Sequence, residues 1–278
     1  MKKFMVTAGI VLVFILGFSI MLYPTVASYI NTLRQSRVVS QYYRDIGNLS
    51  MGDFEAIRTK ADVYNKKIQN KPNRFSFSDE DKEKYFELLN PAGKGIMGTL
   101  YIEKINVRLP IYHGTNEEVL QRGAGHFEGS SLPVGGLGTH SVITGHRGLP
   151  SSIMLTNLDQ LMVGDTFTLI ILNEILTYQV DQILEVEPYE LWPLEIDDYE
   201  DYCTLITCTP YAINSHRLLV RGSRIANEDV DIKSPVYLPD SDAAVIEPLH
   251  ITMLLMIPVL VITLVLLVIR IVREYRKR

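Results

Sequence analysis

The sequence of 278 residues has little cysteine, and it has no long basic block before its last nine positions. Its formal net charge is −5, so we expect no nucleic-acid partner. The two cysteines, Cys203 and Cys208, are an odd number of residues apart in a strand-like run, which points their side chains to opposite faces and prevents pairing. Without a cluster of histidines beside them, they do not form a zinc site, and we expect no metal.

Long uncharged runs are present at both ends of the chain. Residues 4–23 and residues 251–269 contain no charged side chain. As helices, both runs reach about 30 Å, which is the thickness of the hydrocarbon layer of a membrane. We expect the first to be a membrane anchor, with a signal peptide cleaved near Ala27 as the alternative, and the second to be a transmembrane helix rather than a buried core helix.

The residues after the second run decide the expected orientation. The tail, residues 270–278, carries five basic side chains, at Arg270, Arg273, Arg276, Lys277 and Arg278. Basic residues next to a span stay in the cytoplasm. With two spans, both termini are then cytoplasmic and the domain between them is extracellular.

The region after the first run is expected to be helical. Apolar residues recur at helical spacing after Val26, and a second helix is predicted from Ser50, with Asp53 completing a capping box, to about Gln69. Residues 72–84 then contain a run of charged side chains, "SDEDKEK". We expect this stretch to be a solvated, mobile loop without an anchor, followed by a short helical piece.

From residue 97 the periodicity changes to the alternation of β-strands. Strands are predicted within residues 99–114, 165–188, 201–208 and 216–225, with a turn at Asn173 and Glu174 in the second range. The absence of a regular alternation of strands and helices favours an all-β barrel or sandwich.

Cys208 lies at the end of one of these strands, two residues before Pro210. Proline cannot continue a central ladder, so the thiol is expected at a rim of the sheet. Arg217 follows nine residues later, and a hairpin would return it to the same rim. Because arginine stays protonated, it would donate hydrogen bonds to a carbonyl or an oxyanion rather than act as a base.

A nucleophilic thiol needs a proton acceptor, and a histidine is the usual one. The chain has six histidines, at positions 113, 126, 140, 146, 216 and 250. His140 and His146 are an even number of residues apart in one strand-like run, so either one can face the cysteine. The spacing alone does not choose between them.

Four segments together closely resemble the sortases, the cysteine transpeptidases of Gram-positive cell surfaces. They are "GAGHFEGSSLPVGG", "SVITGHRGLP", "LITCTPY" and "NSHRLLVRG", and the resemblance extends over about residues 97–225. With a second membrane span, the chain looks like class C, the sortases that polymerise pilins. The resemblance implies a closed eight-stranded β-barrel with an N-terminal helical appendage and flanking transmembrane helices.

The resemblance also implies roles for individual residues. The catalytic residues are His146, the nucleophile Cys208 and Arg217, whereas His126 and His140 support the barrel. The implied reaction cleaves a sorting motif of the Leu-Pro-x-Thr-Gly type through a thioacyl intermediate and joins a pilin, or another surface protein with this motif, to a lysine amine. It needs no metal or organic cofactor.

The expected segments are a membrane anchor or signal segment (1–25), a helical region with a lid-equivalent loop (26–96), the catalytic barrel (97–226), a linker (227–250), the transmembrane helix (251–269) and a cytoplasmic basic tail (270–278). The lid-equivalent loop departs from the class C pattern, because it has no Asp-Pro-aromatic motif. A lid would then be absent, shortened or rebuilt around Phe75 or Phe77. Cys203 is expected to be a small buried hydrophobic residue.

Two other functions are compatible with the same residues. One is a housekeeping sortase, which attaches proteins to a cell-wall precursor. The other is a catalytically inert, membrane-tethered β-domain that binds a surface partner.

Overall fold

The computed structural model describes residues 2–227, 269 and 273. Apart from these last two positions and residue 227, the predicted linker (227–250), second span (251–269) and basic tail (270–278) lie outside the described residues. The contacts divide the chain into two compact units. The described part of the first consists of residues 2–33 and 150–152 with 269 and 273, and that of the second consists of residues 34–149 and 153–227.

The first unit is built on the N-terminal part of helix α1 (Lys2–Ile46). From Val11 onwards this helix is long and apolar enough to cross a membrane, a property that a signal sequence shares. Its apolar side chains, such as Val13 and Ile20, are exposed. The helix passes through Pro24 and continues past residue 25, so the predicted anchor and the helix that was expected to follow it form one element.

In the second unit, buried polar side chains fix the end of α1 and helix α2 to the rest of the fold; for α2 this side chain is Asn65, which hydrogen-bonds to both main-chain groups of Leu132. Tyr42, near the end of α1, donates a hydrogen bond to Met97 O and accepts one from Leu172 N, both at 2.9 Å. Helix α2 (Met51–Gln69) begins at the N-cap Ser50, and the capping box with Asp53 that the sequence predicted is present. Because the main-chain groups of α2 are satisfied at this end, the helix starts where the local sequence dictates.

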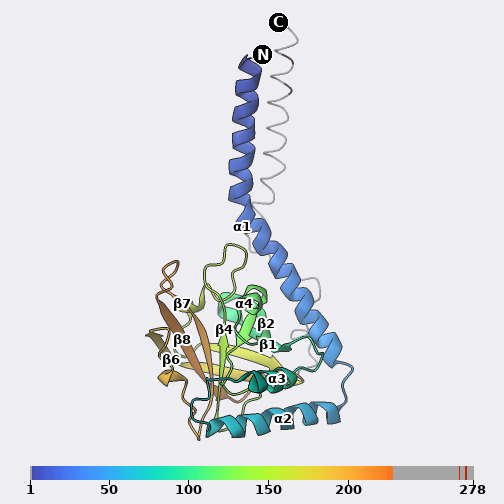
Figure 1. Cartoon of the computed structure of the whole chain (residues 1–278), viewed down its shortest axis with the longest axis vertical. Coiled ribbons are helices and arrows are strands. Elements are labelled where there is room, and N and C mark those ends of the chain that lie inside the picture. Colours follow the sequence, from blue (N-terminus) through green and yellow to red (C-terminus); the bar gives the residue numbers. More distant parts are fainter. Residues whose placement is uncertain (1, 228–268, 270–272, 274–278) are drawn as a thin grey trace. The chain divides into compact units, whose positions relative to one another are not determined.

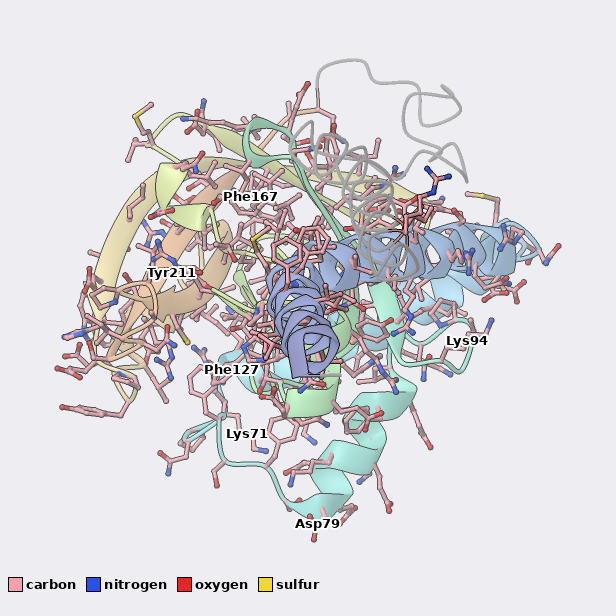
Figure 2. The ribbon with its side chains drawn as sticks, turned by 90° about the horizontal axis from the view of Figure 1, so that it is seen from above. Lys71, Asp79, Lys94, Phe127, Phe167 and Tyr211 are labelled. Carbon is pink, nitrogen blue, oxygen red and sulfur yellow. The ribbon has the colours of Figure 1, made fainter. Side chains whose placement is uncertain are left out.

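Residues 72–84, predicted to be a solvated loop without an anchor, are anchored at Arg74 and Phe75, so the prediction that no anchor exists was wrong; the charged side chains of residues 78–84 are mostly exposed, as expected. Their charged run begins helix α3 (Asp79–Glu87), which is capped by Ser78, and Asp79 lies at the periphery (Figure 2). Before the helix, the buried Arg74 donates a hydrogen bond to Leu194 O at 2.5 Å, and Phe75 packs on Phe127 with ring centroids 5.4 Å apart.

The end of α3 is anchored by Tyr85, which is completely buried. Its hydroxyl lies 2.7 Å from Nδ1 of His126 and accepts a hydrogen bond from the N–H of Gly114. The charged side chains before Tyr85 therefore do not exclude docking, because a helix can expose them while it buries one aromatic residue.

Residues 96–225 form a closed barrel of eight strands, in the order β1-β2-β3-β4-β7-β8-β6-β5 (Figure 1). The alternation allowed a barrel or a sandwich, and the structure is a barrel. The β2–β3 and β4–β7 pairs are parallel and the other pairs are antiparallel. The strands are β1 (Ile96–Ile102), β2 (Val107–His113), β3 (Ala124–His126), β4 (Thr139–Thr144), β5 (Thr166–Ile171), β6 (Glu174–Val186), β7 (Asp201–Thr209) and β8 (His216–Ile225).

Short helices lie in the connections of the barrel. They are α4 (Glu117–Arg122) and the single 3-10 turns η1 (Glu103–Ile105), η2 (Leu158–Gln160) and η3 (Trp192–Leu194). The β5–β6 turn uses Leu172 and Asn173, one residue earlier than predicted, and Leu172 takes the left-handed backbone conformation with φ of 52°.

The side chains on the two faces of β7 pack in different apolar clusters. Cys203 and Leu205 belong to the main core, and both are fully buried. The expectation that Cys203 is a small buried hydrophobic residue is confirmed. On the other face, Ile206 packs against a smaller cluster, whose members are Phe75, Phe127, Val142, Leu184, Val186, Leu191, Leu194 and Leu219. Cys208 shares the face of Ile206, because successive side chains alternate along a strand.

Candidate active site

The β7–β8 hairpin brings Cys208 and Arg217 directly opposite each other. Cys208 is the next-to-last residue of β7, and its register partner on β8 is Arg217. The turn between them is closed by hydrogen bonds from Ile213 N and Asn214 N to Pro210 O. The hairpin predicted from the nine-residue spacing is therefore present, and residues that are opposite each other in an antiparallel pair project from the same face.

His146 reaches the same level through the parallel β4–β7 pair. The last residue of β4, Thr144, is in register with Ile206. The pairing continues beyond the strand, since Gly145 N donates to Ile206 O at 3.0 Å and the Thr207 hydroxyl donates to Gly145 O at 2.8 Å. His146 follows two residues after Thr144, just as Cys208 follows two residues after Ile206. We call His146, Cys208 and Arg217 the candidate catalytic row, or the row.

A buried arginine fixes the loop that carries His146. The side chain of Arg147 is 8% exposed and forms an ion pair with Asp159 of η2. Its second terminal nitrogen donates a hydrogen bond to the hydroxyl of Thr209, one residue after Cys208, at 3.3 Å. Arg147 thus ties the histidine loop to the end of the strand that carries the thiol. Sequence reasoning missed this role, because its only local signal is the position of Arg147 next to His146.

The Arg217 guanidinium is held at the rim by main-chain oxygens. Its Nη1 donates to His216 O at 3.0 Å and to Asn214 O at 3.3 Å. Within residues 2–227 it forms no ion pair with a carboxylate, whereas Arg221 on the same strand pairs with Asp181 at 2.8 Å. Among residues 2–227, no carboxylate therefore neutralises the charge of Arg217, and this charge can act on an oxygen of a bound substrate.

The His146 ring contacts one charged side chain in the described part of the chain, Glu117 at the start of α4. Its Nε2 lies 3.4 Å from Oε1 of Glu117, which is ion-pair distance without the geometry of a hydrogen bond. The His146 side chain is 21% exposed. Its Nε2 atom is buried, so the exposed part of the ring lies away from this nitrogen.

His126 and His140 are both inside the protein and are held by hydrogen bonds. Burial lowers the pKa of His126 to about 3 and that of His140 to about 4. His140 Nδ1 lies 2.8 Å from Glu195 O, and its Nε2 lies 2.7 Å from the hydroxyl of Thr204. At neutral pH both rings are uncharged and closed to substrate, so neither one can carry a proton for the row.

The remaining histidines do not join the row either. His113 is buried, and its ring nitrogens lie 3.1 Å from Gly95 O and 2.6 Å from Leu88 O. His216 precedes Arg217 on β8, so alternation turns its side chain to the other face. His250 lies outside the described residues. The spacing left His140 and His146 open. In the strand register His140 pairs with Tyr202, six residues before Cys208, whereas His146 follows the last pair, Thr144 and Ile206, by two residues.

The smaller apolar cluster lies beside the row. Ile206 and Leu219, a register pair of β7 and β8, are each two residues from Cys208 and Arg217 on the same face. Phe75 packs against this cluster together with Phe127. The segment predicted as lid-equivalent is therefore seated on the face that carries the row, although it has no Asp-Pro-aromatic motif. Cys208 itself is half-buried.

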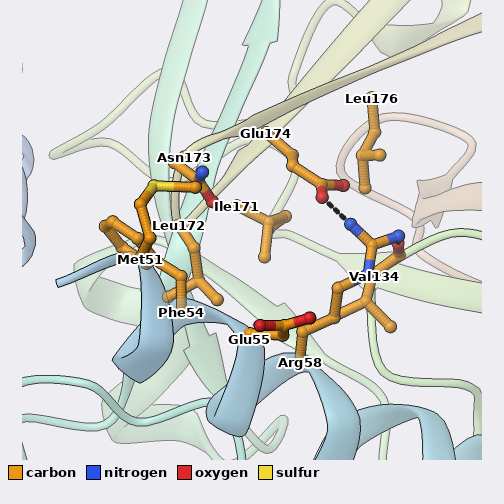
Figure 3. A pocket seen from close by; sticks show the side chains of 10 residues that line it. All are labelled: Met51, Phe54, Glu55, Arg58, Val134, Ile171, Leu172, Asn173, Glu174 and Leu176. Carbon is orange, nitrogen blue, oxygen red and sulfur yellow. Dashed lines mark hydrogen bonds and ion pairs between the residues drawn. The ribbon is translucent and has the colours of Figure 1, made fainter. Parts of the chain in front are cut away.

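A pocket of about 330 Å³ lies between α2 and the β5–β6 hairpin (Figure 3). At its mouth Arg58 forms an ion pair with Glu174. Its lining residues are Met51, Phe54, Glu55, Arg58, Val134, Ile171, Leu172, Asn173, Glu174 and Leu176. The pocket lies at the start of β6, and this part of β6 pairs with the end of β8. Arg217, at the start of β8, pairs with Val186 at the other end of β6. The pocket is thus at the end of the barrel opposite to the row.

The described residues contain no group of three or more His, Cys, Asp or Glu side chains placed to hold a metal ion. The chemistry that the row can perform uses its own groups. A thiol can attack a carbonyl, an imidazole can transfer a proton, and a guanidinium can stabilise the negative charge on oxygen.

Known proteins share both the sequence and the fold. Residues 100–225 match the profile of the sortase domain family. The chain is 47% identical in sequence to sortase C1 from Streptococcus agalactiae, over 69% of this chain and 100% of that one. The TM-score to the crystal structure of that protein is 0.67. The chain is 41% identical to sortase C of Streptococcus pneumoniae, with a TM-score of 0.60, over 68% of this chain and 97% of that one. It is also 26% identical to sortase D of Bacillus subtilis (strain 168), over 58% of this chain and 78% of that protein.

Proposed function

Because the chain belongs to the sortase family of cysteine transpeptidases, we propose that the row of His146, Cys208 and Arg217 cleaves a sorting motif of the Leu-Pro-x-Thr-Gly type and transfers the acyl part to an amine. The observation that carries this proposal is the strand register. Cys208 on β7 pairs with Arg217 on β8, and Thr144 of β4, two residues before His146, pairs with Ile206, two residues before Cys208.

The first half of the reaction forms a thioester. The Cys208 thiolate attacks the threonyl carbonyl carbon, and the carbonyl oxygen becomes an oxyanion to which Arg217 donates hydrogen bonds. The bond between threonine and glycine then breaks. Protonated His146 gives its proton to the departing glycine amine, so this amine leaves as a neutral group.

The second half transfers the acyl group. A new amine attacks the thioester carbonyl and loses a proton to His146, which regains the charge that it held at the start. The oxyanion is again stabilised by Arg217. Its collapse expels the thiolate of Cys208 and leaves an amide, so the enzyme returns to its initial protonation state.

The second amine is proposed to be the side chain of a pilin lysine, which makes the enzyme a pilin polymerase. This proposal is supported by class C sortases at 47% and 41% identity, whose resolved chains are covered almost completely. The structure of the Streptococcus pneumoniae protein is described in terms of pilin substrate specificity, which is a statement about that protein.

Two products distinguish pilin joining from other acyl transfer. The full-length chain, incubated with a peptide that contains the motif, should gain the mass of the peptide up to threonine. Hydroxylamine should remove this added mass.

With a purified pilin as the only acceptor, an SDS-resistant ladder should form, and replacing the acceptor lysines by arginine should abolish this ladder. Adduct formation with a ladder that survives this replacement would refute the lysine acceptor, and no adduct at all would refute the transpeptidase.

The proposed membrane topology rests on the basic side chains of the tail, residues 270–278, and on helix α1. One apolar helix, α1, supports an anchor at the N-terminal end, and sortases work at the cell surface. We propose that both termini are cytoplasmic and that the catalytic barrel is extracellular. Protease added to intact protoplasts should digest the barrel and spare an epitope tag placed after Arg278. Digestion of the tag in intact protoplasts would show that the orientation is wrong.

A further inference from the structure

We propose that Glu117 is a positioning residue that orients the His146 ring and fixes which of its two nitrogens exchanges the proton. This inference rests on the proposed function, in which His146 moves the proton. Glu117 is the first residue of α4, and Oε1 of its carboxylate lies 3.4 Å from Nε2 of His146. No motif of the sequence marked this residue.

The orientation of the Glu117 carboxylate is set within α4. Gln121, one helical turn later, donates a hydrogen bond from Nε2 to the same Oε1 at 2.9 Å. The start of the helix is fixed by Asn116, whose side chain accepts the N–H of Val119 at 2.9 Å. The oxygen that faces the imidazole is therefore held by a side-chain pair at the spacing that brings helical neighbours together.

Among the charged groups on the elements that carry or adjoin the row, Glu117 stands apart. These groups are Glu117, Glu118 and Arg122 of α4, Arg147 with Asp159, and Cys208 and Arg217 of the hairpin. Glu118 pairs with Arg122 at 2.6 Å, and Asp159 pairs with Arg147. Within residues 2–227, Glu117 is the carboxylate of this set that has no cationic side chain other than the imidazolium.

The contact assigns different work to the two ring nitrogens. A carboxylate next to Nε2 stabilises a proton on that nitrogen, in the imidazolium and in the neutral tautomer alike. Nδ1 is then the nitrogen that gives a proton to the leaving amine and takes one from the attacking amine. At 3.4 Å the contact is loose, which is common for such pairs before the substrate is bound.

The expected size of the effect follows from exposure. The Glu117 side chain is 67% exposed, and solvent screens an exposed charge pair. Replacing Glu117 by glutamine, which keeps the shape and removes the charge, should shift the neutral His146 ring toward the tautomer that carries its proton on Nδ1. The kcat/KM for thioester formation at neutral pH should fall about three- to tenfold.

The test compares full-length variants in detergent with histidine rings labelled for NMR. The His146 signal is identified by its loss in His146→Gln. The chemical shifts of its ring nitrogens, which report the tautomer, are followed together with kcat/KM. Glu117→Gln should change both, and Glu117→Asp, which keeps the charge, should change them less. The matched control is Glu118→Gln, which removes an equal charge from the next position and should leave the His146 tautomer and kcat/KM unchanged. Thermal unfolding confirms that each variant is folded.

The outcomes separate this inference from the proposed function. If His146→Gln is inactive while Glu117→Gln keeps the His146 ring shifts and the turnover of the unmodified chain, the role of Glu117 is refuted and the catalytic row stands. If His146→Gln keeps full activity, the proposed catalytic row is refuted as well. Equal shifts in Glu117→Gln and Glu118→Gln would mean that a general surface charge acts on the ring, which overturns the specific contact.

Discussion

Replacing Cys208 by alanine should abolish thioester formation and amine transfer, with no acyl-enzyme adduct detectable by mass spectrometry. A methyl group cannot attack a carbonyl, and the other cysteine, Cys203, is fully buried in the main core with its side chain on the opposite face of β7. Burial also raises the pKa of the Cys203 thiol well above its ordinary value, so this thiol cannot supply the missing thiolate.

The matched control is the substitution of the second cysteine. Cys203→Ala removes a buried sulfur and leaves the row intact, so it should reduce stability by a cavity effect of about 1–2 kcal/mol and keep acyl transfer. Adduct formation by Cys208→Ala at the unmodified rate would eliminate Cys208 as the nucleophile. Loss of adduct in Cys203→Ala, with the chain still folded, would contradict the division of roles between the two thiols.

Replacing Arg217 by alanine should lower kcat/KM for thioester formation by roughly 10²- to 10³-fold, which is the usual loss for a donor to an oxyanion. Its guanidinium forms no ion pair within residues 2–227, and main-chain oxygens hold it opposite Cys208. Arg217→Lys should restore little, because an ammonium lacks the planar pair of donors. The rate of adduct formation, measured at several peptide concentrations, is the readout.

Arg221 provides the control for Arg217. It lies on the same face of β8, four residues further along, where it pairs with Asp181 and stacks on Tyr202 at 4.1 Å. Arg221→Ala removes an equal charge from a position away from the row, and its turnover should stay within about twofold of the unmodified chain. If both arginine variants lose activity to the same extent, Arg217 acts through the charge of the strand and not through the substrate oxygen.

Local sequence predicted the features that depend on neighbouring residues. The capping box of Ser50 and Asp53 forms as expected, because both partners lie within one helical turn. The pairing of Cys208 with Arg217 also follows from sequence, since a short turn and strand alternation fix it. The number of strands and the closure of the barrel required the resemblance, because alternation has the same period in a barrel and a sandwich.

Features that depend on distant partners could not be read from the sequence. His146 is distinguished from His140 only by the parallel register of β4 with β7, two strands that lie 62 residues apart. The anchors of the segment before and within α3 are Arg74 and Tyr85, and their partners, Leu194 O and His126, belong to other parts of the fold. Glu117 carries no local signal, since a charged residue at the start of a short helix usually reports only on the helix itself.

The parallel pairing of β4 with β7 has a consequence for the timing of activity. Two strands separated by 62 residues can join only after the intervening chain has been made, and closing such a long loop is slow compared with forming a hairpin. Synthesis proceeds from the N-terminus, so His146 emerges well before Cys208, and Arg217 on the last strand emerges after both. A chain that is still being synthesised therefore has His146 without Cys208 and Arg217, and it cannot form a thioester before the barrel closes.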